Sequence, residues 1–124
     1  MNREFIQYEQ ALALKELGFD EPCLMYYDYS WRLVESGVYK YKAPLYQQAF
    51  RWFREEHGIC SWIERLYTEN SVAYYKTNQE YKEDASSKMH NLIISLKEYN
   101  TYEKAELACL VKLIKRLKVK LHET

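Results

Sequence analysis

Residues 59–77 read ICSWIERLYTENSVAYYKT, a stretch that predicts a β-hairpin near the middle of the chain. Residues 59–67 carry apolar side chains on both faces of an extended chain, which is typical of a well-buried strand. The four residues TENS that follow have the composition of a turn, and residues 72–77, VAYYKT, return as the partner strand. The hairpin places an antiparallel sheet at the centre of the predicted fold.

The segment after the hairpin contains a polar stretch and then an apolar one. Residues 78–88 are polar and predict a loop. Residues 89–98 fit two patterns, a helical stripe (Met89, Leu92, Ile93, Leu96) and strand alternation (Leu92, Ile94, Leu96). We favour a strand, because the apolar run is short.

Three amphipathic helices are expected around these strands, at residues 4–17, 44–57 and 101–121. Gly18 and Gly58 follow the last apolar positions of the first two helices and predict glycine C-caps, with Pro22 preventing continuation of the first. Pro44 suits the first turn of the second helix, and Thr101 is a favourable N-cap for the third.

Residues 23–42 connect the first two helices and are rich in aromatic and β-branched residues. They predict a hairpin or short meander with Gly37 near a turn. The expected fold is therefore α+β, with a small antiparallel sheet of about four to five strands and three amphipathic helices packed mainly on one face. We expect residues 1–124 to form a single domain.

Composition restricts the classes of protein to consider. The 124 residues carry 18 Lys and Arg against 18 Asp and Glu, so the basic excess typical of duplex-DNA-binding proteins is missing. Three widely spaced cysteines do not suit a secreted disulfide framework. The sequence shows no signal peptide and no apolar run long enough for a membrane span. We therefore expect a cytoplasmic, or at least an intracellular, protein.

The sequence contains no phosphate-binding glycine loop, dinucleotide fingerprint, zinc-protease motif or nucleophile elbow. His57 and Cys60 form one short ligand pair, whereas closed zinc sites normally need two, and the remaining candidate ligands (Cys23, His90, Cys109) are isolated. Cys60 with His57 or His90 is a conceivable nucleophile pair without an identifiable third member. We expect no metal, no cofactor and no enzymatic activity.

Thirteen tyrosines are the unusual feature of the chain. Tyrosine combines a large contact area with a polar tip and is enriched at interfaces, although it also favours strands for structural reasons. Six strand tyrosines form the candidate interaction surface: Tyr27, Tyr29, Tyr39, Tyr41, Tyr74 and Tyr75.

Basic residues cluster near the end of the third helix, at Lys112, Lys115, Arg116, Lys118 and Lys120. Cations at a helix C-terminus are usually solvated and suit the helix dipole. The alternative is that these five residues contact phosphate groups.

Four stretches together carry a family resemblance: YEQALALKELGFDEPC at 8–23, YYD at 26–28, PLYQQAFRWFREEHGI at 44–59 and NTYEKAELACLVKLI at 100–114. In this order they resemble an uncharacterised family of small proteins from phages and mobile elements of Bacteroides-type gut bacteria. The resemblance implies such an origin and a strand rather than a helix at 89–98. It implies no catalytic residue.

Three functions remain open. The favoured one is a non-enzymatic accessory protein that acts by protein–protein interaction, as a homodimer or small oligomer and with an unknown host or phage protein. The alternative is a protein that binds or sequesters a nucleotide or nucleic acid, with strand tyrosines stacking on bases and the C-terminal lysines on phosphates. The third is a small enzyme that uses Cys60 and a histidine.

Overall fold

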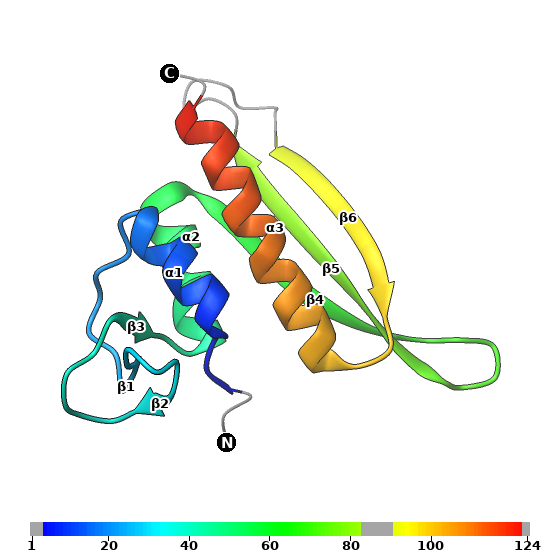
Figure 1. Ribbon diagram of the computed structural model, residues 1–124. Helices are drawn as coiled ribbons and strands as arrows, with labels where there is room; N and C mark the ends of the chain where they lie inside the picture. Colours follow the sequence, from blue (N-terminus) through cyan, green and yellow to red (C-terminus); the bar gives the residue numbers. More distant parts are fainter. Residues whose placement is uncertain (1–3, 83–90, 123–124) are drawn as a thin grey trace. The chain divides into compact units, whose positions relative to one another are not determined.

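The computed structural model describes residues 4–82 and 91–122 (Figure 1). The chain divides into two compact units: unit 1 contains residues 1–49 and 114–124, and unit 2 contains residues 50–113. Within the described residues the fold is α+β, with three α-helices and two antiparallel sheets of three strands each. The predicted α+β class is confirmed, but the prediction of one sheet with about four to five strands is wrong. The strands of unit 1 are two or three residues long and pair with one another, whereas those of unit 2 are nine or ten residues long.

Unit 1 is built on helix α1 (Tyr8–Glu16) and a sheet with strand order β2-β1-β3. Its strands are β1 (Met25–Tyr27), β2 (Leu33–Val34) and β3 (Tyr41–Ala43). Of the two arrangements predicted for residues 23–42, the hairpin is observed, between β1 and β2, whereas β3 pairs on the other side of β1, so the three strands form no meander. Gly37, at φ 103°, lies between β2 and β3. The buried residues of this unit include both aliphatic and aromatic side chains, among them Ile6, Leu14, Phe19, Tyr41 and Leu117.

The end of α1 follows the predicted glycine cap. The Phe19 N–H donates to the Leu14 carbonyl over 2.9 Å, and the Gly18 N–H donates to the Lys15 carbonyl over 3.1 Å. Gly18 has φ 99°, which a side chain would oppose, so these two bonds form a Schellman motif. The motif turns the chain sharply and fixes Asp20 just beyond the helix.

Helix α2 (Tyr46–His57) is followed by the three long strands of unit 2, β4 (Ile59–Tyr67), β5 (Ala73–Lys82) and β6 (Asn91–Tyr99), in the order β4-β5-β6. Helix α3 (Tyr102–His122) begins after Thr101, whose hydroxyl accepts a hydrogen bond from the Lys104 N–H over 3.2 Å. The predicted N-cap and the preference for a strand at 89–98 are therefore confirmed, although residues 89 and 90 lie outside the described residues.

Two predictions in unit 2 are wrong. Residues 78–82 continue β5 instead of forming a loop. The first two of these polar residues have side-chain partners: the Asn78 amide donates to the Glu64 carboxylate over 2.8 Å, and the Gln79 amide donates to the Cys109 carbonyl over 3.1 Å. The rest of that predicted loop, 83–88, lies outside the described residues. The prediction of a well-buried strand at residues 59–67 is also wrong. Ile59 is the one buried residue of β4, and Trp62 and Tyr67 are exposed.

The first turns of α3 cover one face of the β4-β5-β6 sheet (Figure 1). The Gln79 bond to Cys109 joins this face to the helix, and the Tyr75 ring lies edge-to-face on Tyr102 with 5.9 Å between ring centroids. In unit 1, α1 covers the sheet through Tyr8. Each sheet is thus covered by its own helix. This arrangement differs from the expected one, in which three helices pack on one face of a single sheet. None of the described helices combines the length and apolar character that a membrane span requires.

Candidate functional site

Tyr8 is the centre of an aromatic cluster in unit 1. Its ring meets Tyr27 and Tyr41 edge-to-face, at centroid distances of 5.6 and 5.4 Å, and Trp31 at 5.5 Å. The Tyr27 hydroxyl donates to the Ile6 carbonyl over 2.7 Å, and burial raises the pKa of this hydroxyl. Tyr41 is buried, with 8% of its surface exposed. Tyr27 and Tyr41 therefore hold the small sheet on α1, instead of lying on the open surface expected of them.

The turn between β1 and β2, residues 28–32, is organised by one carboxylate and is called the Asp28 turn below. Asp28 Oδ1 accepts hydrogen bonds from the backbone N–H groups of Ser30 and Arg32, over 2.8 and 2.9 Å. Its Oδ2 lies 3.4 Å from Arg32 Nε. The hydrogen bond from the Arg32 N–H is the main reason why the pKa of Asp28 lies below its ordinary value. These contacts close the turn without help from the rest of the chain.

The Asp28 turn displays two large aromatic side chains. Tyr29 is 66% exposed and Trp31 is 68% exposed. Trp31 has φ 65°, a left-handed conformation that a bulky residue rarely adopts and that costs about 1–2 kcal/mol. The fixed hydrogen bonds of Asp28 keep the chain in this conformation, so the two rings are presented in a defined geometry.

The segment between β2 and β3 extends the exposed aromatic surface. Val38 is 78% exposed and Tyr39 is 44% exposed. The Tyr39 ring stacks on Tyr26, with 4.2 Å between centroids and 28° between planes. We call Tyr29, Trp31, Val38 and Tyr39 the aromatic surface. Sequence reasoning had identified the two tyrosines but missed Trp31 and Val38; the signal for Trp31 was an aspartate two residues before a serine, the pattern of an Asx turn.

Tyr74 and Tyr75, the other predicted surface residues, belong to unit 2. Both are half-buried, and as neighbours on β5 they point to opposite faces of the sheet. Tyr75 packs on Tyr102 beneath α3. The six predicted tyrosines therefore fall into three pairs: the exposed Tyr29 and Tyr39, Tyr27 and Tyr41 packed on Tyr8, and Tyr74 and Tyr75 on β5.

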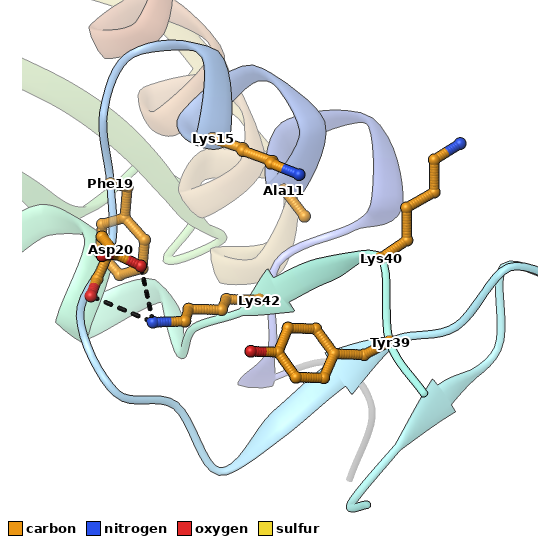
Figure 2. Close-up of a pocket in the computed structure, with 7 residues that line it drawn as sticks. All are labelled: Ala11, Lys15, Phe19, Asp20, Tyr39, Lys40 and Lys42. Carbon is orange, nitrogen blue, oxygen red and sulfur yellow. Dashed lines mark hydrogen bonds and ion pairs between the residues drawn. The ribbon is translucent and has the colours of Figure 1, made fainter. Parts of the chain in front are cut away.

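A cavity of about 200 Å³ lies beside the aromatic surface, within unit 1 (Figure 2). Its described lining comes from α1, from the turn after it, and from the chain leading into β3: Ala11, Lys15, Phe19, Asp20, Tyr39, Lys40 and Lys42. We call it the lysine pocket. Sequence reasoning missed all three lysines, although Lys40 and Lys42 alternate with the tyrosines that it identified.

The three ammonium groups of the lysine pocket are held differently. Lys42 Nζ lies 2.9 Å from Asp20 Oδ1 and 3.1 Å from the Asp20 carbonyl oxygen, as Figure 2 shows, and this contact raises the pKa of Lys42. Lys15 and Lys40 instead lie over the ring of Tyr41, with Nζ 5.2 and 5.3 Å from its centroid. A hydrogen bond to the Tyr8 side chain is the main cause that raises the pKa of Lys40. The raised pKa values keep the Lys40 and Lys42 side chains cationic at neutral pH.

The basic residues predicted to contact phosphate lie along α3. Lys112, Lys115, Lys118 and Lys120 are exposed and Arg116 is half-buried. At about 100° per residue they spread over more than half of the helix circumference. The five basic side chains therefore do not converge on one narrow face of the helix.

The surroundings of the described cysteines and histidines bear on nucleophile and metal chemistry. Burial raises the pKa of the Cys23 thiol to about 11, and burial also raises the pKa of the Cys109 thiol. The His57 ring packs edge-to-face on Trp52, at 4.7 Å. His90 lies outside the described residues, and within the described part of the chain no three His, Cys, Asp or Glu side chains gather as a metal site would require.

The candidate functional site is therefore the aromatic surface together with the lysine pocket, both carried by unit 1. Tyr39 belongs to both. Comparison of the chain with protein-family models, with curated proteins and with solved structures finds no match.

Proposed function

We propose that this protein is a non-enzymatic accessory protein of a phage or mobile element, that it works in the cytoplasm of its bacterial host, and that it acts by protein–protein contact as a homodimer. The origin rests on the family resemblance of residues 8–28, 44–59 and 100–114. The contact rests on the Asp28 turn, which holds Tyr29 and Trp31 exposed in a fixed geometry.

Exposed aromatic side chains of this kind are suited to binding. Tryptophan and tyrosine dominate the energetics of protein interfaces because they bury large areas in few rotatable bonds. The Asp28 turn also removes much of the entropy cost of ordering a loop on binding. The hydrogen bonds of the Asp28 turn hold Trp31 exposed instead of buried. A contribution to folding stability therefore does not by itself explain this turn.

The chemistry of the surface supports a second copy of the chain as the partner. In a twofold dimer the same patch meets itself, so a patch must carry groups that complement one another. The aromatic surface lies next to Arg32 and Lys40, and Lys40 Nζ already lies 5.9 Å from the Tyr29 ring centroid. Cations of one copy can thus lie on the rings of the other. The net charge of zero removes long-range repulsion between copies.

Sedimentation equilibrium of the purified chain between about 1 and 100 µM tests the proposal, since dimers of ordinary affinity dissociate within or below this range. We expect a dimer for the wild type and a monomer for the double variant Tyr29→Ala, Trp31→Ala. Trp62→Ala is the matched control, because Trp62 is a partly exposed tryptophan on β4 of unit 2, and it should leave the dimer intact. A wild type that is monomeric at 100 µM, or a double variant that stays dimeric, would refute the homodimer.

A further inference from the structure

The lysine pocket has an unusual charge composition, although one of its lysines, Lys40, also lies next to the proposed dimer contact. Three ammonium groups line it, and among its described lining residues Asp20 has the one carboxylate. Asp20 is itself bound to Lys42, and its side chain is 92% exposed. In the described part of the chain neither Lys15 nor Lys40 has a carboxylate within ion-pair distance. Two cations therefore lie at the ring of Tyr41 without a counter-ion from the described residues.

Like charges held together in this way favour an anionic ligand. The end of α1 lies beside Lys15, and a helix C-terminus carries about half a negative charge, which opposes an anion. Two points outweigh that effect. The Schellman bonds already occupy the Leu14 and Lys15 carbonyls, and two full positive charges exceed the partial charge of the helix end.

A phosphate monoester fits the lysines better than a carboxylate does. It carries up to two negative charges and three terminal oxygens, and it therefore interacts with two ammonium groups at once. Lysine binds phosphate as a mobile point charge and needs no planar bidentate geometry. Lys15 on α1 and Lys40 on the chain before β3 both line the cavity, and the Lys40 side chain, which Figure 2 draws extended away from Tyr39 and Lys42, must turn toward the cavity to share a ligand with Lys15.

Tyr39 adds a recognition element for a planar ring. It lines the pocket and stacks on Tyr26 at 4.2 Å, so the two tyrosines form a rigid aromatic platform. A base that stacks on such a platform gains affinity without base-specific hydrogen bonds. At about 200 Å³ the cavity lies below the usual range of about 300–1,000 Å³ for small-molecule sites, so the ligand is small and part of it stays outside.

We propose that the lysine pocket binds a mononucleotide, with the terminal phosphate at Lys15 and Lys40 and the base on the ring of Tyr39. The proposal assigns the phosphate contact to the lysine pocket instead of to the basic residues of α3. Tyr39 and Lys40 also take part in the proposed dimer contact, whereas Lys15 belongs to the pocket alone, so variants of Lys15 test the pocket apart from the homodimer.

Isothermal titration calorimetry with adenosine 5′-monophosphate tests the assignment, with adenosine, inorganic phosphate and a single-stranded oligonucleotide as comparison probes. We expect the mononucleotide to bind at least about tenfold more tightly than adenosine or phosphate alone, because it uses both parts of the site. Binding should weaken as salt rises from about 50 to 300 mM, since screening reduces the attraction to the exposed lysines. Absence of binding at millimolar mononucleotide, or tighter binding of the oligonucleotide, would overturn the proposal.

Two lysine variants distinguish this pocket from the C-terminal helix. Lys15→Gln should weaken mononucleotide binding about tenfold, the usual effect of losing one charged contact, and Tyr39→Leu should weaken it by a similar factor. Lys118→Gln is the matched control, because it removes an exposed lysine of α3 and should change nothing. Weakening by Lys118→Gln but not by Lys15→Gln would place the phosphate on α3 and refute the pocket. Unchanged mononucleotide binding in the Tyr29→Ala, Trp31→Ala variant would show that the pocket binds its ligand without the dimer contact. Loss of binding in that variant, when it is folded, would refute the assignment of the site to the pocket alone.

Discussion

Thr77 is a buried polar residue in the interior of unit 2. Its side chain is fully buried, and its hydroxyl oxygen has no hydrogen-bond partner. It lies on β5 opposite Ile63 of β4, at the point where the pairing of β5 with β6 shifts register. Thr77 shares its face of the sheet with Gln79, whose amide is bonded to α3, so helix and strand enclose the Thr77 hydroxyl.

Thr77→Val should stabilise the protein. Valine has nearly the same shape as threonine, so the replacement leaves no cavity and removes a hydroxyl whose burial without a partner costs about 1–3 kcal/mol. We take the lower end, because small shifts of the chain relieve part of the cost, and expect a gain of about 1 kcal/mol in the free energy of unfolding. An unfolding entropy of about 2.1 cal/mol/K per residue converts this gain, for 124 residues, into a rise in Tm of about 4 °C.

Urea denaturation followed by circular dichroism, together with thermal melting, measures both quantities. Thr77→Ser is the matched control, because it keeps the hydroxyl, removes a buried methyl group and should lower stability by about 1 kcal/mol. If Thr77→Val is less stable than the wild type, the hydroxyl makes a favourable bond, as it would to a buried water, and our account of this part of the interior is wrong.

Two further predictions concern ionisation. The lowered pKa of Asp28 means that its contacts add stability above the ordinary carboxyl pKa of about 3.9, and that this stability is lost as the pH falls through the lower folded value. Melting curves between about pH 6 and 2.5 should therefore differ between the wild type and Asp28→Asn at neutral pH and converge in acid; a constant difference would contradict the role of the carboxylate. Because the pKa of Cys23 is about 11, its thiol should react slowly with iodoacetamide at pH 8 and faster as the pH approaches 11, as followed by mass spectrometry of the modified peptide. Rapid modification of Cys23 at pH 8 would show that the thiol is not buried as described.

The elements that could be predicted are those with local signals at their ends. Strand β4 begins after Gly58 and ends before the polar turn at Thr68, and its predicted bounds are those observed. Helix α3 begins where Thr101 supplies its cap. In contrast, residues 78–82 lack an apolar pattern, and their place in β5 depends on partners distant in the chain, Glu64 and Cys109. A local reading of the sequence cannot find such partners.

The candidate site was predictable only in part for the same reason. The abundance of tyrosine pointed to residues 27–41, but the exposure of each ring depends on tertiary packing: Tyr41 is buried against Tyr8, whereas Tyr29 faces solvent. The lysine pocket combines Lys15 from α1 with Lys40 and Lys42 beside β3. In the sequence Lys15 is an ordinary basic residue in the last turn of a helix, and nothing near it in the chain indicates a site.

The two units differ in what holds their sheets together, and this difference explains why the candidate site lies in unit 1. Nine- and ten-residue strands give unit 2 long ladders of backbone hydrogen bonds. The short strands of unit 1 offer few such bonds, so side chains stabilise the sheet: the Tyr8 cluster, the Asp28 carboxylate and the Lys42–Asp20 pair. Aromatic and charged groups are consequently concentrated there for structural reasons. Tyr41 is buried in this structural role, whereas Trp31, Tyr29 and Lys15 remain largely exposed even where they contact the cluster, and for that reason they are the residues to assign to binding.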